Sequence, residues 1–359
     1  MADTLASSTH GQRNHDAGPL RQVGLIGHPV AHSHSPAMQQ AAFAALGVAA
    51  RYALWDTAPD QLATQVARLR EPGYLGANVT IPYKAAVIPY LDAITPQARM
   101  LAGVVNTITR EETTSGIRLI GHNTDVLALV HILDEQQAGN GSHGPGDTTF
   151  ASDAADRADT ASGDQIGAQR AMREHTGATG RPGRLLVLGA GGAAQAALGA
   201  ALLQGLEPWV AARRLAAALD ALAALYARQP PTSRTPVARA WQAHALDLND
   251  AAALGQALRE TQVLVNATPI GTRDPDAAPL PLELLRLLPE EAFTLDMVYN
   301  PPETALVRAA RALGRRASGG FDMLVYQGAA AFTLWTRQPA PVVVMREALR
   351  ASLASDGSA

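Results

Sequence analysis

A glycine-rich turn lies between a fully apolar strand and a helix near the middle of this sequence. Leu185-Leu-Val-Leu188 is followed directly by Gly189-Ala-Gly-Gly-Ala-Ala194, which opens an alanine- and leucine-rich helix over 193–203. In such a turn the first glycine permits the bend, the second lets the backbone approach a pyrophosphate, and a small third residue allows helix and strand to pack closely. The N–H groups of the helix N-terminus then face the phosphates. The pattern predicts a dinucleotide-binding βαβ unit, and a plain glycine turn is the alternative.

Strands and helices alternate on both sides of this turn. Short apolar runs predict strands at 21–27, 52–55, 75–80, 104–109, 117–121, 185–188, 209–212, 263–265, 293–298 and 316–318. Apolar residues at helical spacing predict helices at 36–46, 59–70, 82–90, 95 onward, 124–134, 193–203, 215–227, 304–313, 323–335 and 343–353. Connections long enough to hold a helix favour parallel neighbouring strands. The predicted fold class is therefore α/β with mostly parallel strands.

The length of the chain suits two domains. The 359 residues are too many for one ordinary core. We expect an N-terminal α/β substrate-binding domain and a Rossmann-type NADP-binding domain, with bounds of 21–124 plus 321–355 and 125–138 plus 184–320. The last two helices have no place in a completed nucleotide-binding sheet, so we expect them to return to the first domain.

Two segments are poor in large apolar side chains. Residues 1–20 have no periodic apolar pattern, and residues 139–183 are rich in Gly, Ser, Thr, Asp and Ala. Such segments cannot bury enough apolar surface to offset the entropy of ordering them. We therefore expect a disordered tail and a disordered insertion; a regulatory or partner-binding segment is the alternative for the insertion.

Composition argues against several classes of function. Lysine and arginine total 29 against 32 acidic residues, which gives a net charge of −3, and aromatic residues are 4%. Nucleic-acid partners are therefore not expected. The absence of cysteine excludes disulfides, thiolate zinc sites and cysteine nucleophiles. Because there is no membrane-spanning apolar run and no signal peptide, we expect a cytoplasmic protein that binds a small molecule and has no membrane partner.

The end of the strand after the glycine turn indicates which dinucleotide binds. An acidic residue about 20 positions beyond the turn would hold a ribose 2′-hydroxyl and select NAD. Here the strand ends with Ala212-Arg213-Arg214 instead. Guanidinium groups pair with phosphate through a rigid fork, which favours the 2′-phosphate of NADP over NAD. Two solvated arginines at a strand end are the alternative.

Two polar loops of the first domain carry candidate chemistry. Ser33 and Ser35 lie two residues apart before a helix, where Ser35 fits the N-cap, and together they can hold a carboxylate. Thr80 ends a predicted strand, Lys84 lies on the first turn of the next predicted helix, and Asp125 lies at a strand-to-helix junction. Lys84 and Asp125 are a candidate acid–base pair. The alternatives are a plain helix cap for Ser35 and Asp125 and a solvated helix residue for Lys84.

Three histidines, His28, His32 and His34, also cluster in the polar loop that contains Ser33 and Ser35 (residues 27–36, the serine loop). Pro29 and Pro36 prevent a helix that would align their rings, and no carboxylate is near in sequence. We therefore expect no metal site there.

Several motifs occur in the same order as in one enzyme family. They are Ala31-His-Ser-His-Ser-Pro36, Gly76-Ala-Asn-Val-Thr-Ile-Pro-Tyr-Lys84, Ala102-Gly-Val-Val-Asn-Thr107, Gly121-His-Asn-Thr-Asp125, Gly189-Ala-Gly-Gly-Ala193, Val265-Asn-Ala-Thr268, Asp296-Met-Val-Tyr-Asn-Pro301 and Met323-Leu-Val-Tyr-Gln327. Through them the chain resembles the shikimate dehydrogenase family, shikimate/quinate dehydrogenases included, from about Val23 to Leu133 and from about Leu185 to Leu353. An ordered set of motifs is more specific than any one of them.

The resemblance implies reversible, NADP-linked reduction of 3-dehydroshikimate to shikimate in aromatic amino-acid biosynthesis. It implies that Lys84 and Asp125 handle the proton at the C3 oxygen while hydride passes to or from the nicotinamide. The implied substrate-binding residues are Ser33, Ser35 and Tyr299 for the carboxylate, and Thr80, Asn106 and Gln327 for the ring hydroxyls. The implied cofactor-binding residues are Gly189, Ala190, Gly191, Gly192, Ala193, Arg213, Arg214, Met297 and Gly320.

Some positions depart from the usual family pattern. Val126 and Asp322 stand where glycine is common, Thr272 where methionine is common, and Ala217 where a further arginine often lies. The runner-up function is a quinate/shikimate dehydrogenase that uses NAD or both cofactors. A non-catalytic shikimate-binding paralogue is the third hypothesis, against which Lys84 and Asp125 together argue. Both a monomer and a homodimer are compatible with the sequence.

Overall fold

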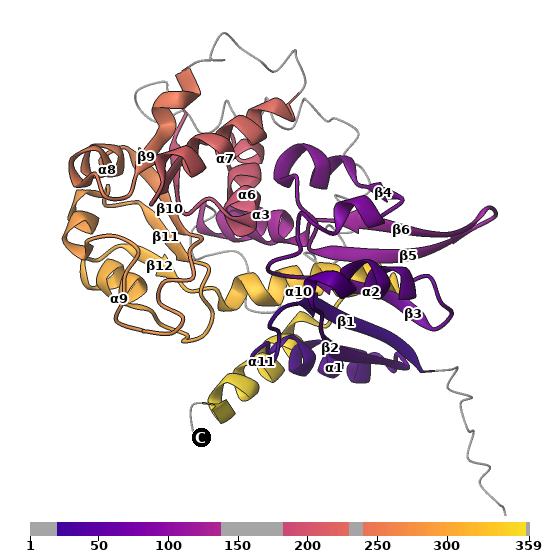
Figure 1. Ribbon diagram of the computed structural model, residues 1–359. Helices are drawn as coiled ribbons and strands as arrows, with labels where there is room; N and C mark the ends of the chain where they lie inside the picture. Colours follow the sequence, from indigo (N-terminus) through magenta and orange to yellow (C-terminus); the bar gives the residue numbers. More distant parts are fainter. Residues whose placement is uncertain (1–19, 138–181, 230–239, 357–359) are drawn as a thin grey trace, which may run out of the picture.

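The chain forms two sheets joined by helices. The computed structural model describes residues 20–137, 182–229 and 240–356, and each of its two main sheets has six strands (Figure 1). The predicted α/β class is confirmed. Almost all of the expected tail and insertion, namely residues 1–19 and 139–181, lies outside the described residues.

The first sheet has the strand order β2-β1-β3-β5-β6-β4. Its strands are β1 (Arg21–Gly27), β2 (Ala50–Asp56), β3 (Tyr74–Val79), β4 (Ala93–Ile94), β5 (Thr107–Thr113) and β6 (Gly116–His122). β1 pairs in parallel with β2 and β3, and β4 with β6, whereas β5 is antiparallel to β3 and β6. This sheet is therefore mixed, because the short link between β5 and β6 allows only an antiparallel hairpin.

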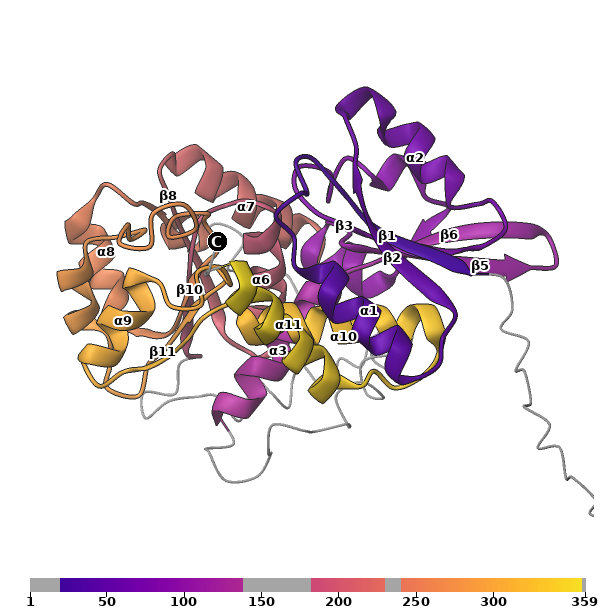
Figure 2. The ribbon, with the colours of Figure 1, turned by 90° about the horizontal axis from the view of Figure 1, so that it is seen from below.

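Helices cover both faces of the first sheet. They are α1 (Ser35–Ala45), η1 (Pro59–Gln61), α2 (Leu62–Arg68), η2 (Ile88–Tyr90), α10 (Phe321–Thr336) and α11 (Val342–Asp356). A further short helix, η3 (Ala98–Ala102), packs against helices of the other half of the molecule. Successive strand residues point to opposite faces, so Val23 and Leu25 join the core under α1, α10 and α11, while Ile26 joins the core under α2 (Figure 2). The two C-terminal helices thus return to the first sheet, as predicted.

The second sheet is parallel throughout, in the order β12-β11-β10-β7-β8-β9. Its strands are β7 (Arg184–Leu188), β8 (Glu207–Ala212), β9 (Ala245–Asp247), β10 (Thr261–Asn266), β11 (Phe293–Asp296) and β12 (Arg316–Ser318). This is the doubly wound order of dinucleotide-binding sheets, whose ligand site lies where the order reverses, here between β7 and β10. The glycine-rich turn follows β7 directly, so it lies at that point.

Helices also cover both faces of the second sheet. They are α6 (Gly192–Leu203), α7 (Leu215–Ala227), η5 (Ala240–His244), α8 (Ala251–Leu258), η6 (Leu282–Leu287) and α9 (Ala305–Ala312). Leu185 and Val187 pack in the core with α6 and α7, and Leu186 and Leu188 in the core with α8 and α9. Four elements of this half were not predicted: β9, which has only three residues, the short helices η5 and η6, and α8, which begins where Asp250 accepts two backbone N–H groups.

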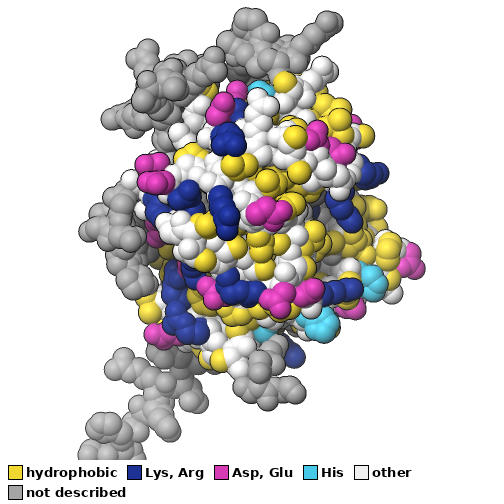
Figure 3. All heavy atoms as spheres, turned by 90° about the vertical axis from the view of Figure 1, so that its left-hand side faces the viewer, with side chains coloured by type: hydrophobic (Ala, Val, Ile, Leu, Met, Phe, Trp, Pro, Cys, Tyr) yellow, Lys and Arg dark blue, Asp and Glu magenta, His cyan; other side chains and the backbone are white. Residues whose placement is uncertain are grey.

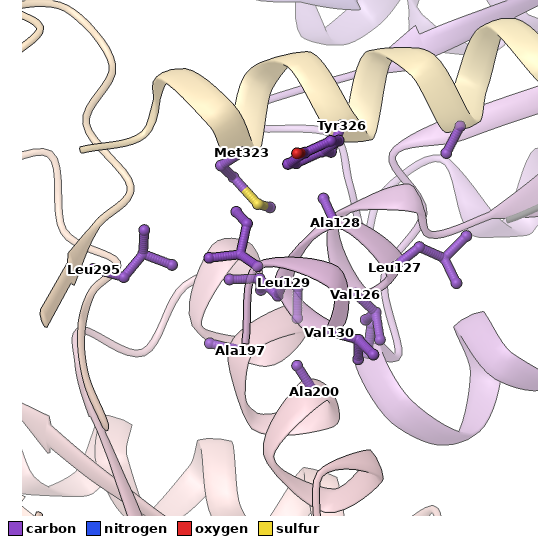
Figure 4. Close-up of a cluster of buried hydrophobic side chains, with 14 of the residues drawn as sticks. Val126, Leu127, Ala128, Leu129, Val130, Ala197, Ala200, Leu295, Met323 and Tyr326 are labelled. Atoms are coloured by element: carbon purple, nitrogen blue, oxygen red, sulfur yellow. The ribbon is translucent and has the colours of Figure 1, made fainter. Parts of the chain in front are cut away.

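Helix α3 (Thr124–Gln137) lies between the two halves of the molecule. Figure 4 shows its apolar side chains between Met323 and Tyr326 of α10 and Ala197 and Ala200 of α6. All of these residues belong to one continuous buried cluster. The N-terminus of α3, which carries Asp125, is therefore held by packing from both directions.

The described surface has mixed charge on the face shown in Figure 3, where acidic and basic side chains are interspersed. Among the described residues, no helix is long and apolar enough to span a membrane.

Candidate active site

Lys84 lies in a turn, not in the helix predicted for 82–90. Turns follow β3, and the only helical element in this stretch is η2, which contains Pro89. Proline removes a backbone donor and disfavours helical backbone in the residue before it, so a helix across this stretch is interrupted. The turn is anchored by the Tyr83 hydroxyl, which donates to the carbonyl of Thr57 at 2.6 Å, and by the carbonyl of Lys84, which accepts from Val105 N at 2.8 Å.

Lys84 and Asp125 form an ion pair although they are far apart in sequence. Lys84 Nζ donates to Asp125 Oδ2 at 2.6 Å, and the two side chains are 17% and 8% exposed. Asp125 lies in the first turn of α3, where the helix dipole stabilises a carboxylate. A lysine whose ammonium group is held by a carboxylate is positioned to give a proton to a bound oxygen and to take it back. The structure therefore brings together the candidate acid–base pair.

Lys84 also lies beside the glycine-rich turn of the other sheet. A β-carbon placed on Gly192 would stand 3.4 Å from Cδ of Lys84. Gly192 is the first residue of α6, and Gly191, its N-cap, offers no side chain to the N–H groups of the first turn. Gly189 has φ +106°, a conformation that favours glycine. The turn thus leaves backbone donors open next to the lysine, as a dinucleotide phosphate site requires.

The other predicted cofactor residues lie on the carboxyl edge of the second sheet. Arg213 and Arg214 are exposed at the end of β8. Met297 follows β11, and its N–H donates to the carbonyl of Asn266 at 3.0 Å. Gly320 packs so closely that a β-carbon there would lie 2.4 Å from the carbonyl oxygen of Met297. Ala190 and Ala193 lie within the glycine turn and the first turn of α6. These residues fit the demands of a bound NADP.

Ser33 and Ser35 are adjacent, but Ser35 is not the helix N-cap. Helix α1 begins at Ser35 itself, with His34 before it and no side-chain capping bond. The Ser33 hydroxyl donates to Ser35 Oγ at 3.1 Å and accepts from the Ser35 backbone N–H at 3.3 Å. Because the two serines bond to each other, they form one hydroxyl pair at the N-terminus of α1, and this arrangement suits a carboxylate.

Buried polar side chains connect the serine pair with the acid–base pair. Tyr52 donates from its hydroxyl to Asn78 Oδ1 at 2.8 Å, and burial raises its pKa far above the ordinary value although a hydrogen bond from Ser35 opposes the shift. Asn78 Nδ2 donates to the carbonyl of Asn106 at 3.2 Å and to Thr107 Oγ1 at 3.1 Å. Tyr52 and Asn78 were given no role from the sequence. The sequence signal that could have identified them is a polar side chain within an otherwise apolar predicted strand, because such a group needs a hydrogen-bond partner when it is buried.

Asn106 completes this connection next to Asp125. Its Nδ2 donates to Thr124 Oγ1 at 3.0 Å, and its Oδ1 accepts from the Thr124 backbone N–H at 2.7 Å. Thr80 follows β3, and Gln327 lies in α10 with its amide donating to the carbonyl of Leu324 at 2.9 Å. Within the described residues, the side chains of Thr80 and Gln327 hydrogen-bond to none of the other predicted site residues.

Tyr299, which follows a strand of the second sheet, lies next to the serine loop of the first domain. It lies in the loop after β11, and its ring meets the His34 ring edge-on with 6.1 Å between centroids. Burial raises the pKa of the Tyr299 hydroxyl, and a backbone hydrogen bond from His34 partly offsets the shift. The loop is held by Asp296, which accepts from Thr304 Oγ1 at 2.6 Å and from Asn266 Nδ2 at 2.9 Å. The third predicted carboxylate ligand therefore lies at the serine loop.

Two further features lie apart from this arrangement. His28 Nδ1 lies 2.7 Å from Asp56 Oδ1 on an exposed surface, and no group of three or more His, Asp or Glu side chains among the described residues could hold a metal.

A hollow lined by Arg184, Glu207 and Phe293 opens at the other edge of the second sheet, where β7, β8 and β11 begin. Open α/β sheets bind ligands at the carboxyl ends of their strands, so we do not assign the hollow to the reaction.

Comparison with known proteins gives consistent results near both ends of the chain. Residues 25–108 match the family profile of the shikimate dehydrogenase substrate binding domain, and residues 320–350 match that of the shikimate 5′-dehydrogenase C-terminal domain. A shikimate dehydrogenase (NADP⁺) of Symbiobacterium thermophilum is 38% identical over 342 residues, covering 95% of this chain and 98% of the relative. One from Moorella thermoacetica is 36% identical, covering 93% and 95%.

Solved structures agree with the sequence relatives. The crystal structure of shikimate 5-dehydrogenase from Thermus thermophilus, in complex with NADP(H) and shikimate, superposes with a TM-score of 0.66 at 32% identity. The alignment covers 92% of this chain and 99% of that one. Together with the identity to full-length relatives, this shows that the chain belongs to the shikimate dehydrogenase family.

Proposed function

We propose that this protein catalyses the reversible, NADP-dependent reduction of 3-dehydroshikimate to shikimate, a step of aromatic amino-acid biosynthesis. The observation that carries the proposal is the Lys84–Asp125 ion pair, at 2.6 Å, beside the open N-terminus of α6. A ketone reductase needs a hydride donor and a proton donor at the same carbonyl group. This arrangement supplies a proton-transferring pair next to a dinucleotide site.

Lys84 and Asp125 manage the proton in this proposal. Reduction adds a hydride to C3 of the substrate and a proton to the C3 oxygen, and oxidation removes both. When bound, the nicotinamide supplies or accepts the hydride. Lys84 Nζ gives the proton to the oxygen or takes it back, and Asp125 orients the ammonium group and stabilises its charge.

The remaining site residues bind a neutral polyol ring with one carboxylate. Ser33, Ser35 and Tyr299 hold the carboxylate, and Thr80, Asn106 and Gln327 bond the ring hydroxyls. The fixed bonds of Asn106 to Thr124, at 2.7 and 3.0 Å, support its role because they hold its amide in one orientation. A site built to bond hydroxyls rejects analogues that lack them, since its own polar groups would stay unpaired.

The cofactor roles belong to Gly189, Ala190, Gly191, Gly192 and Ala193 at the phosphates and to Arg213 and Arg214 at the 2′-phosphate, with Met297 and Gly320 as further cofactor-binding residues. We assign residues 21–124 and 321–355 to the substrate-binding domain and residues 125–138 and 184–320 to the cofactor domain. The protein is proposed to act in the cytoplasm as a monomer or homodimer.

A four-way steady-state assay tests the function. Shikimate and quinate are each oxidised with NADP and with NAD, and the change in nicotinamide absorbance is recorded. We expect the highest kcat/KM for shikimate with NADP. A higher value for quinate or for NAD would favour the quinate/shikimate dehydrogenase. Calorimetric binding of shikimate and NADP without any absorbance change would instead favour a non-catalytic binding protein.

A further inference from the structure

His34 lies between the two serines of the proposed carboxylate site and is only 5% exposed. Both of its ring nitrogens contact other parts of the chain. Nδ1 lies 2.9 Å from Ser352 Oγ in α11, and Nε2 lies 3.4 Å from Asn300 Nδ2 in the loop after β11. A buried ring that only filled space would not need two polar partners from two distant segments.

The two contacts are compatible with one state of the ring. As placed, the Asn300 amide donates to Nε2, so Nε2 is the acceptor and Nδ1 carries the hydrogen. Nδ1–H can then donate to Ser352 Oγ. Ser352 is half-buried on α11, which packs along α1, so this bond ties the serine loop to the C-terminal helix (Figure 2).

The same residue holds the tyrosine that comes from the other sheet. The His34 ring packs edge-on against Tyr299 at 6.1 Å, and its backbone bonds the Tyr299 hydroxyl. His34 is thus covalently linked to both serines. Its ring and its backbone contact Tyr299, and its ring also contacts Asn300, the residue after Tyr299. Tyr299 and the serines follow strands of different sheets, and no side-chain bond between them is found among the described residues.

We infer that His34 is a positioning residue that sets Tyr299 against the Ser33–Ser35 pair, so that the three hydroxyls converge on one carboxylate. This rests on the proposed function, because the carboxylate is that of shikimate. The His34 ring contacts Ser352, Asn300 and Tyr299, and none of these residues has a proposed role in proton or hydride transfer. Its loss should weaken carboxylate binding and leave proton and hydride transfer almost unchanged.

The test compares shikimate with its methyl ester, which keeps the ring and loses the charge. In His34→Ala we expect the KM for shikimate to rise about tenfold, with kcat and the KM for NADP changed less than twofold. The preference for shikimate over the ester should fall by a similar factor. His34→Asn, which can still bond Ser352, should recover part of the affinity. The matched control is His32→Ala, since His32 is exposed in the same loop.

Ser352→Ala and Asn300→Ala keep the ring and remove one contact each, so they test the inference if His34→Ala does not fold. Each should raise the KM for shikimate by a smaller factor than His34→Ala. The inference is overturned if the KM for shikimate is unchanged in all of these variants, or if activity on shikimate and on the ester falls in parallel. Wild-type protein without any shikimate turnover would overturn the proposed function, and this inference with it.

Discussion

At the scale of single residues, the most informative position is Lys84. The chain has 29 lysines and arginines together, and Lys84 is its only lysine. Every other basic residue among these is therefore an arginine. A guanidinium does not release its proton at physiological pH, whereas an ammonium can. The single lysine thus stands where proton transfer is proposed, beside Asp125 and Gly192.

Replacing this lysine should lower turnover strongly and leave substrate binding almost unchanged. We expect Lys84→Ala and Lys84→Arg to lower kcat for shikimate by about 10²–10⁴-fold, the usual contribution of a positioned acid–base group. The KM for shikimate should change little, because the carboxylate and hydroxyl contacts remain. Steady-state kinetics from nicotinamide absorbance measure both values. Arg118→Ala, an exposed change on β6, is the control and should keep wild-type kcat.

The same position allows a chemical check. An amine-reactive reagent can modify only Lys84 and the α-amino group, because no other side chain carries a primary amine. Modification should abolish activity, and shikimate with NADP should protect against it. Full activity in protein modified at Lys84 would contradict the assignment.

A second residue-scale prediction concerns His122, which is buried next to the site. Burial lowers its pKa to about 4, and the charge of Arg337 adds to the shift. In the unfolded chain His122 has its ordinary pKa of about 6.5, so between pH 6.5 and pH 4 it is protonated there but not in the native state. The stability that His122 contributes is therefore complete above pH 6.5 and falls as the pH drops toward 4.

Between pH 7.5 and pH 5 we expect the contribution of His122 to the free energy of unfolding to fall by about 2 kcal/mol. Urea unfolding at the two pH values measures it in the wild type and in His122→Gln, which cannot be protonated. The fall in the free energy of unfolding from pH 7.5 to pH 5 should be smaller in His122→Gln than in the wild type by about 2 kcal/mol. Equal losses in both proteins would show that other groups cause the pH dependence.

At the scale of elements, the cofactor site depends on where strands end and helices begin. β7 and β8 end side by side because their residues pair in parallel register from Arg184–Glu207 to Leu188–Ala211. The glycine turn and the Arg213–Arg214 pair therefore lie on one edge of the sheet. One strand end offers backbone N–H groups, and the next offers guanidinium groups.

Removing the arginines should change cofactor preference and not the reaction. Charge-assisted bonds contribute about 1.5–3 kcal/mol, so we expect Arg213→Ala with Arg214→Ala to raise the KM for NADP by about 10–100-fold. The KM for NAD, which has no 2′-phosphate, should stay near its wild-type value. Arg259→Ala, an exposed change at the other end of the domain, is the control. A parallel rise for both cofactors would argue against 2′-phosphate recognition.

At the scale of the whole molecule, the relative position of the two sheets determines whether the site is complete. Lys84 lies in the turn after β3 of the first sheet and Gly192 opens the helix after β7 of the second, so their proximity depends on contacts between the halves. One such contact is Arg228 at the end of α7, which donates to Gln195 Oε1 in α6 at 2.7 Å and to the carbonyl of Leu101 in η3 at 3.2 Å. Burial lowers the pKa of this guanidinium.

Arg228→Ala should weaken the joint between the halves. It leaves a buried carbonyl and amide oxygen without their charged donor, at a cost of about 1–3 kcal/mol in the free energy of unfolding. Denaturant unfolding measures this as a lower midpoint. Arg286→Ala, exposed on η6, is the matched control. An unchanged midpoint for Arg228→Ala would show that this contact does not stabilise the joint.

The sequence predicted the features that have a local pattern. A run of apolar residues before a glycine turn and an alanine-rich helix specifies a βαβ unit by itself, because each part reflects the conformation of a few neighbouring residues. The α/β class and the return of the last helices were likewise predictable from the order and number of elements. Where local signals conflict or are short, as at residues 82–90 and in β9, the prediction failed.

Only the tertiary structure decided which distant residues meet. Lys84 and Asp125 are 41 positions apart, and His34 and Ser352 are 318 apart, so no spacing rule links either pair. Their contacts result from strand pairing and from the packing of α3, α10 and α11. Such contacts form only when apolar surfaces from remote segments are buried together, and a linear pattern does not contain that information.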